Sequence, residues 1–190
     1  FTRPGSVELR EEPLQPLPGQ ALVRSLRMGI SHGTELLAFR GELPAGLEAD
    51  PVLKSLGGRL EYPLKYGYSN CGVVEQVAPG PSTAAGIRAG QRVFAFFPHQ
   101  DRFYAEPADL IALPEGVSDE QAVFLANLET AIGVVHDAGV RFGERVLVVG
   151  LGVVGLLASA LLLRSGVREL IAVEPHGLRR EQAGRLGCRA

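Results

Sequence analysis

The chain has 190 residues, of which 46% are hydrophobic, and a formal net charge of -2 at pH 7. A chain of this length can bury one or two hydrophobic cores, and its charge balance argues against nucleic acid or an anionic membrane as a partner. Its two cysteines, Cys71 and Cys188, are too few for a disulfide framework or a four-cysteine zinc site. We therefore expect a reducing, cytoplasmic location. The longest apolar stretch, 153–163, is too short to span a bilayer.

The first half of the chain predicts a β-rich domain. Alternating apolar and polar residues indicate strands at 7–10 and 21–26, and further strands are expected at 72–77, 92–97, 103–105 and 110–112, with a turn at 79–81. The intervening prolines favour a small, irregular antiparallel barrel. The segment 41–66 has no sustained periodicity. We expect it to be either a binding loop or lid, or an ordinary loop packed on the surface of the domain.

The pattern changes at Ser118, where a second domain is expected to begin. Ser118 and Gln121 have the spacing of a capping box ahead of an apolar segment. A helix is predicted over 128–136, and another over 178–186 after the second strand of the domain.

The most informative motif is a G-x-G-x-x-G that follows the apolar strand 146–149 and opens an apolar helix. Gly150 permits a tight turn, Gly152 lets the backbone approach a pyrophosphate, and Gly155 lets the helix pack closely on the strand. The helix also directs free N–H groups and its positive dipole end at the phosphates. The predicted cofactor-binding residues of this turn are Gly150, Leu151, Gly152, Val153, Val154 and Gly155.

A second strand, 170–173, ends in Glu174, where a carboxylate can hold the ribose hydroxyls of a dinucleotide. A 2′-phosphate beside this carboxylate would cost about 1–4 kcal/mol at intermediate dielectric, so we predict NAD(H) as the preferred cofactor. Arg179 and Arg180 argue for the alternative, NADP(H), if they pair with the phosphate rather than face solvent. An ordinary βα turn without a ligand is the competing interpretation of the motif.

The order of these features resembles the medium-chain dehydrogenase/reductase superfamily. The resemblance rests on the turn 86–93, on Leu128-Glu129-Thr130-Ala131 and on the run 143–150 that leads into the glycine motif. It implies an α/β fold with a β-rich N-terminal domain: a GroES-like barrel, the catalytic domain, at 1–117, and the incomplete start of a Rossmann doubly wound parallel sheet at 118–190.

The same resemblance implies an oxidoreductase that transfers a hydride between a nicotinamide cofactor and a small-molecule substrate, either an alcohol or ketone or an enone or quinone. The segments 29–36 and 62–68 look most similar to the hydroxyethyl-bacteriochlorophyllide dehydrogenase branch. Relatives imply a homodimer in the full-length chain. Because a Rossmann sheet has about six strands, we expect the natural chain to continue beyond Ala190.

This sequence differs from the zinc-dependent members of the superfamily at the metal ligands. Their Gly-His-Glu-x-x-Gly segment reads here Gly67-Tyr68-Ser69-Asn70-Cys71-Gly72, and their later ligand cysteine falls on Ala126. The first ligand cysteine falls on Ser31 or His32. His32 with Glu35 does not supply the three protein ligands of a catalytic zinc site, so we expect no metal.

Without a metal, another group must polarise a carbonyl or carry a proton. Tyr68 is the first candidate, either as a donor to an oxyanion or as an aromatic packed among its neighbours. His32 would relay protons, bridge to the cofactor's phosphates or lie on the surface. Glu129 would act as a base or anchor a helix, and Thr130 matches the superfamily's threonine near the nicotinamide. The remaining histidines form no constellation and are expected to be structural or solvated: His99, His136 and His176.

Two function classes therefore stay open. The first is the zinc-free, nicotinamide-dependent oxidoreductase. The second is a non-catalytic dinucleotide-binding protein with a redox-sensing or structural role, and the loss of the zinc ligands is the feature that supports it.

Overall fold

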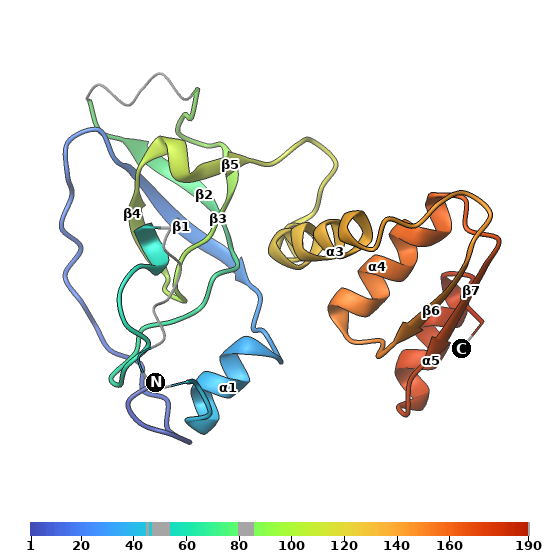
Figure 1. Cartoon of the computed structure of the whole chain (residues 1–190). Helices are drawn as coiled ribbons and strands as arrows, with labels where there is room; N and C mark the ends of the chain where they lie inside the picture. Colours follow the sequence, from blue (N-terminus) through green and yellow to red (C-terminus); the bar gives the residue numbers. More distant parts are fainter. Residues whose placement is uncertain (45, 47–53, 80–85, 190) are drawn as a thin grey trace. The chain divides into compact units, whose positions relative to one another are not determined.

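The computed structural model describes residues 1–44, 46, 54–79 and 86–189. They form two compact units, Phe1–Phe124 and Leu125–Ala190, each with its own sheet (Figure 1). The division falls after helix α2 (Asp119–Ala122), whose Asp119 pairs with Arg92 of the first unit. The predicted catalytic and nucleotide-binding domains, 1–117 and 118–190, stay a prediction.

The first unit is built on a five-stranded antiparallel sheet with the strand order β4-β1-β2-β3-β5. The long pair of β1 and β2 has register shifts after Leu22 and after Ser25. Such irregularities increase the local bend and twist of a strand pair, which lets a small sheet curl around its core. The strands are β1 (Ala21–Met28), β2 (Asn70–Val77), β3 (Arg92–Ala95), β4 (Arg102–Ala105) and β5 (Leu110–Ala112).

One face of this sheet carries the core of the first unit. Val23 of β1 faces Val74 of β2 across the pair, and both are fully or almost fully buried. Phe103 of β4 is stacked on Phe97, with ring centroids 4.1 Å apart. The buried members of the core are Ala21, Val23, Val74, Val93, Ala95, Phe103, Ala105 and Leu110.

Five of the predicted strands are confirmed, and the one at 7–10 is wrong. Its residues form no strand, and Val7 and Leu9 are 60% and 97% exposed, so the alternating pattern there buries nothing. The segment 41–66 holds the short 3-10 helix η1 (Lys54–Leu56). Residues 45 and 47–53 of that segment, and residues 80 and 81 of the predicted turn, lie outside the described part of the chain.

Short helices complete the first unit. α1 (Thr34–Arg40) follows β1, and η3 (Pro107–Asp109) leads into β5. The predicted capping box is confirmed at the start of α2, where the Ser118 side chain accepts the N–H of Gln121 and the Gln121 side chain accepts the N–H of Ser118.

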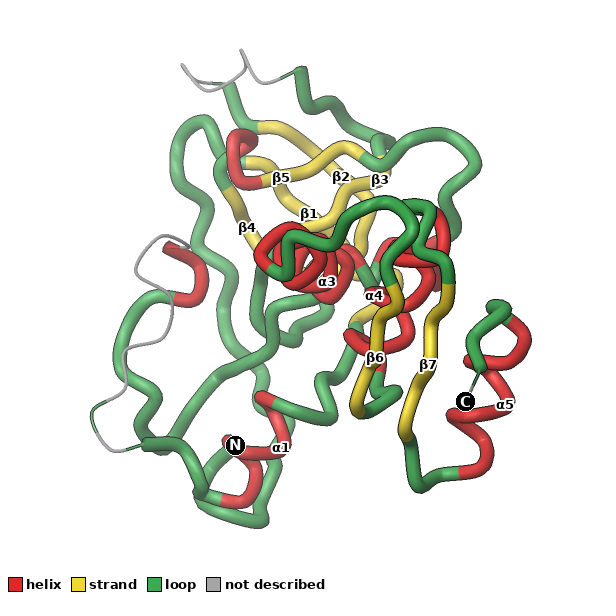
Figure 2. The backbone as a smooth tube through the Cα atoms, turned by 45° about the vertical axis from the view of Figure 1, so that its right-hand side comes forward, coloured by secondary structure: helices red, strands yellow, loops and turns green. Residues whose placement is uncertain are grey.

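The second unit is a strand–helix–strand unit preceded by one helix and followed by another. Its two strands pair in parallel, with Val146 opposite Leu170, and lie side by side in Figure 2. The predicted alternation of helices and strands is confirmed. The elements are α3 (Leu125–Asp137), β6 (Arg145–Val149), α4 (Val153–Arg164), β7 (Glu169–Val173) and α5 (Gly177–Arg185).

The two faces of the β6–β7 pair differ. Val146 and Val148 of β6, with Leu170 and Ala172 of β7, belong to the core that includes residues of α4 and α5. The alternate residues are exposed by 37% to 76%: Leu147, Val149, Ile171 and Val173. No helix in the described part of the chain has the length and apolar character needed to cross a membrane.

Candidate functional site

The glycine turn lies at the end of β6, where the chain reverses into α4. Gly150 adopts φ of 90°, a left-handed conformation that glycine reaches at no steric cost. Its N–H donates to the carbonyl oxygen of Val173 at 2.8 Å, so the turn is tied to the end of β7. The ends of both parallel strands therefore meet at this turn, the edge at which open α/β sheets bind ligands.

The other two glycines of the motif have opposite surroundings. A Cβ atom on Gly155 would lie 2.1 Å from the carbonyl oxygen of Gly150, so only glycine allows α4 to approach the turn this closely. A Cβ atom on Gly152 would meet no atom within 4 Å. The space over Gly152 is thus open, as a backbone that is approached by a pyrophosphate requires.

Glu174 follows β7 directly and is almost fully buried beside the turn. Its carboxylate accepts the N–H of His176 at 2.9 Å and the N–H of Leu151 at 2.8 Å. Hydrogen bonds from His176 first and then from Leu151 lower the pKa of Glu174. The negative charge is therefore held at the glycine turn, and the carboxylate oxygens retain lone pairs for further donors.

The glycine turn, the start of α4 and Glu174 form one corner of the second unit, and two arginines of α5 contact it. The Arg180 guanidinium donates to the carbonyl oxygens of Glu174 and Pro175 at 2.7 and 2.6 Å. The Arg179 guanidinium lies 3.6 Å from the Glu174 carboxylate. Arg180 is exposed and the Arg179 side chain is 39% exposed, so both arginines face solvent while they contact Glu174 and its neighbour, and the structure does not decide between the two alternatives drawn from the sequence.

The residues of this corner fit a dinucleotide. The first N–H groups of α4 have no acceptor within the helix, and the open space over Gly152 lies at that helix end. Glu174 supplies an ionised acceptor at the end of the neighbouring strand. The binding roles predicted for these residues stay predictions.

The predicted catalytic residues are divided between the two units. Tyr68 is half-buried and packs edge-to-face on Tyr66, with ring centroids 6.3 Å apart. His32 is exposed in the turn before α1. Glu129 and Thr130 are exposed on α3, where the Thr130 hydroxyl donates to the carbonyl oxygen of Ala126 at 3.1 Å. The catalytic roles of Tyr68, His32 and Glu129 and the cofactor-binding role of Thr130 stay predictions.

The residues at the expected zinc-ligand positions do not form a zinc donor set. Ser69 is buried and its hydroxyl donates to the carbonyl oxygen of Val123, and Ala126 has no donor atom. Burial raises the pKa of the nearby Cys71 thiol to about 12, with a further contribution from Asp119, which accepts its hydrogen bond. Within the described residues, no three His, Cys, Asp or Glu side chains come together in an arrangement for a metal ion.

One close pair of ionisable side chains was missed by the sequence analysis. His99, expected to be structural or solvated, has its ring Nε2 2.7 Å from Oε2 of Glu35. The Glu35 side chain is only 3% exposed and that of His99 is 24% exposed. These residues are 64 positions apart, and no motif in the sequence links them.

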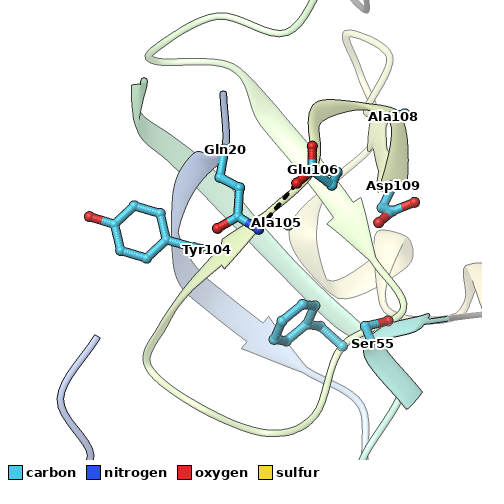
Figure 3. Close-up of a pocket in the computed structure, with 8 residues that line it drawn as sticks. Gln20, Ser55, Tyr104, Ala105, Glu106, Ala108 and Asp109 are labelled. Carbon is cyan, nitrogen blue, oxygen red and sulfur yellow. Dashed lines mark hydrogen bonds between the residues drawn. The ribbon is translucent and has the colours of Figure 1, made fainter. Parts of the chain in front are cut away.

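The first unit also has a hollow of about 510 Å³ beside β4 (Figure 3). Gln20 lies on one side of it and donates to Glu106 at 3.2 Å, the dashed contact in Figure 3. The remaining lining includes Ser55, Phe97, Tyr104 and Asp109. None of the predicted site residues lines this hollow.

Comparisons with known proteins agree with the expected fold. No family model matches the chain. The chain is 24% identical to an alcohol dehydrogenase of Cupriavidus necator over 99% of its own length and 60% of the relative's. It is 30% identical to a probable zinc-binding alcohol dehydrogenase of Mycobacterium tuberculosis over 90% of its own length and 49% of the relative's. The chain thus spans about half the length of these curated relatives.

Solved structures show the same similarity. The alcohol dehydrogenase TADH from Thermus sp. ATN1 matches 99% of this chain with a TM-score of 0.76 and 23% identity, over 60% of its own length. A quinone oxidoreductase of Pseudomonas syringae pv. Tomato matches 100% of this chain with a TM-score of 0.72 and 25% identity, over 56% of its own length. The fold is therefore a GroES-like barrel followed by the start of a Rossmann domain, as predicted. The relatives and neighbours include alcohol dehydrogenases, sorbitol dehydrogenases, probable D-xylulose reductases and quinone oxidoreductases, and the expected zinc-free branch is not shown among them.

Proposed function

We propose that this chain is the barrel and the first part of the cofactor domain of a nicotinamide-dependent oxidoreductase. It transfers a hydride to or from an alcohol or ketone, or an enone or quinone, and it does so without zinc. The observation that carries the proposal is the corner formed by the glycine turn, the start of α4 and the Glu174 carboxylate. The named relatives, all dehydrogenases or reductases, support the same class of reaction.

The cofactor that this corner fits best is NAD(H). In the proposed complex the ionised Glu174 carboxylate accepts hydrogen bonds from the two hydroxyl groups of the adenosine ribose. A 2′-phosphate would bring a second negative charge to the same place. Arg179 already pairs with Glu174 itself, and Arg180 donates through Nη1 to two backbone carbonyl groups, which weakens the case for a 2′-phosphate at this place.

The proposal of zinc-free chemistry rests on the donor atoms of the chain. Tyr68, Ser69 and Ala126 offer a phenol, a hydroxyl that is already engaged and a methyl group, whereas zinc sites use imidazole, thiolate and carboxylate ligands. The loss of these ligands also favours the second candidate, a dinucleotide-binding protein without catalysis.

A homodimer and a cytoplasmic location are also part of the oxidoreductase proposal. Both cysteines are free thiols, which suits a reducing compartment.

A substitution at Gly152 tests cofactor binding without disturbing the fold. In the Gly152→Ala variant the new methyl group meets no protein atom within 4 Å, so we expect an unchanged melting temperature. The same methyl group lies where the pyrophosphate would approach, so we expect NADH affinity, measured by fluorescence titration, to fall at least tenfold, about 1.4 kcal/mol. Equal binding by Gly152→Ala and the unsubstituted protein would contradict the proposed site.

Titrations with both reduced cofactors identify the preferred cofactor, and turnover assays test the reaction. We expect NADH to bind more tightly than NADPH to the unsubstituted protein. Turnover with a panel of ketones, enones and quinones that survives a metal chelator would support the oxidoreductase. Cofactor binding without turnover of any compound would favour the non-catalytic alternative, and stoichiometric zinc with loss of activity on its removal would refute the zinc-free chemistry.

A further inference from the structure

The Glu35–His99 pair lies next to the segment that carries Tyr68, the first candidate catalytic residue. The His99 N–H donates to the carbonyl oxygen of Tyr66 at 3.1 Å, so the loop after β3 is fixed to the strand-like segment before β2. The His99 ring lies against Gly67. A Cβ atom on Gly67 would be 2.5 to 2.7 Å from three atoms of the imidazole. Gly67 adopts φ of 122°, a left-handed conformation, and a side chain there would displace the ring.

Both oxygens of the Glu35 carboxylate have a donor. Oε1 accepts the N–H of Ser31 at 2.8 Å, and Oε2 is 2.7 Å from Nε2 of His99. The first contact fixes the carboxylate to the turn before α1, and the second fixes the imidazole. A carboxylate oxygen accepts hydrogen bonds, so Nε2 carries the hydrogen of this contact. The other ring nitrogen, Nδ1, has no hydrogen bond within the described part of the chain.

A structural explanation of the pair is weak on physical grounds. Removing a carboxylate from water costs several kcal/mol, so a buried ion pair is seldom a net source of stability. The pair is also asymmetric, because the carboxylate is buried while a quarter of the imidazole surface stays open. A histidine oriented by a buried carboxylate, with its second nitrogen free of hydrogen bonds to the described residues, is the arrangement that general acid–base catalysis uses.

We propose that His99, oriented by Glu35, is the proton donor and acceptor of the oxidoreductase, and this inference rests on the proposed function. In the reducing direction the cofactor supplies a hydride, with its electron pair, to the carbon of a carbonyl or enone. The matching proton passes from Nδ1 of the His99 imidazolium to the substrate's oxygen or enolate, and the neutral imidazole then regains a proton from solvent. In the oxidising direction Nδ1 takes the hydroxyl proton. Glu35 is a positioning residue in this scheme, because it acts through His99.

The first test reads the state of the imidazole without any cofactor or substrate. Nitrogen-15 NMR of the histidine rings distinguishes which nitrogen carries the hydrogen in the neutral form. We expect the Nε2–H tautomer for His99 with its Nε2-bound hydrogen slow to exchange with solvent, and faster exchange in Glu35→Ala, where the acceptor is gone. An Nδ1–H tautomer for His99 in the unsubstituted protein would overturn the proposal, whatever its activity.

The second test measures turnover of 1,4-benzoquinone, 2-cyclohexen-1-one and cyclohexanone with NADH or NADPH. We expect His99→Gln to lower kcat about 10²- to 10⁴-fold, the usual contribution of a general acid or base. The dissociation constant of the reduced cofactor should change less than about threefold. Glu35→Gln keeps a hydrogen-bond acceptor but removes the charge, so its kcat should fall by a smaller factor.

His136→Gln is the matched control, since His136 is exposed on α3 and has no place in the proposed chemistry. A kcat within twofold of the unsubstituted protein for His99→Gln would overturn the dyad and leave the oxidoreductase standing. If the unsubstituted protein reduces none of the three compounds and binds neither cofactor, the proposed function itself fails. Should His99→Gln not fold, an Nδ1–H tautomer or a rapidly exchanging Nε2–H in the unsubstituted protein still overturns the dyad.

Discussion

Among the described glycines, Gly155 is the one at which an added Cβ atom would lie closest to another atom. Replacing Gly155 by alanine therefore tests the geometry of the glycine turn. The added Cβ would lie 2.1 Å from the Gly150 carbonyl oxygen. Non-bonded carbon and oxygen atoms do not approach below about 3 Å, so α4 and the turn would have to separate by roughly 1 Å. The oxygen belongs to the backbone and cannot rotate away as a side chain would. Overpacking of this kind costs about 1–3 kcal/mol.

The matched control is Gly184→Ala. Gly184 lies inside α5, and a Cβ atom there would meet nothing within 4 Å. Alanine in place of glycine in a helix stabilises by about 1 kcal/mol. This helix preference is shared by both variants and cancels in the comparison, so the Gly155→Ala variant should be less stable than Gly184→Ala by roughly 1–3 kcal/mol.

Urea unfolding, followed by circular dichroism, measures this difference directly. The same displacement moves the N–H groups at the start of α4 away from a bound pyrophosphate, so we expect NADH affinity to fall at least tenfold. A Gly155→Ala variant as stable as Gly184→Ala would refute the reasoning, because it would mean that helix and turn are not in the close contact described above.

Two further predictions concern the cluster of Cys71, Asp119 and Arg92. With the pKa of Cys71 raised to about 12, very little of its thiol is ionised at pH 8. Its alkylation by iodoacetamide, followed by mass spectrometry, should therefore be about a thousandfold slower than that of an ordinary thiol. Labelling of Cys71 at the rate of a free peptide cysteine would contradict this prediction. The hydrogen bond from Arg92 lowers the pKa of Asp119 in the folded protein. The pKa of Asp119 is lower in the folded protein than in the unfolded chain. Asp119 therefore adds to the free energy of unfolding above its unfolded pKa, and this contribution is lost as the pH falls through its folded pKa. The unsubstituted protein should therefore be more stable than Asp119→Asn at pH 7, and thermal unfolding should show the difference shrinking towards pH 3; a pH-independent difference would contradict the assignment.

The sequence predicted the second unit well because its signals are local. The strand, the glycine turn, the apolar helix and the second strand follow one another within about thirty residues, the length of a single βαβ unit. Each element is recognised from its own periodicity, and the turn residues confirm the order. Gly155 could be assigned its packing role because the motif fixes its distance from the turn along the chain.

Strands of the barrel were harder to delimit, because their ends depend on contacts made elsewhere. The strand expected at 92–97 ends at Ala95 in the structure. The carbonyl group of Phe96 instead accepts the hydroxyl of Ser55, a residue of the long segment between β1 and β2. An apolar run indicates where a strand can form, but the partner of each backbone group decides where it stops.

The same reasoning explains why the Glu35–His99 pair escaped the sequence analysis. A catalytic motif is recognised when its members have a fixed spacing on one element, whereas these two residues lie on a short helix and on a loop 64 positions later. What brings them together is the folding of the turn before α1, the segment at Gly67 and the loop after β3 around one another. The absence of zinc ligands leaves the proton donor unassigned in the sequence, and Tyr68 is its first candidate because it stands at the position of a zinc ligand in the zinc-dependent relatives. Tyr68 is joined to its surroundings by packing on Tyr66, while His99 has a buried carboxylate to orient it. Proton transfer requires a group that is oriented and exchanges its proton, and His99 meets this requirement more fully than the phenol of Tyr68 does. Tyr68 is then better suited to donate a hydrogen bond to the substrate's oxygen than to give up its proton.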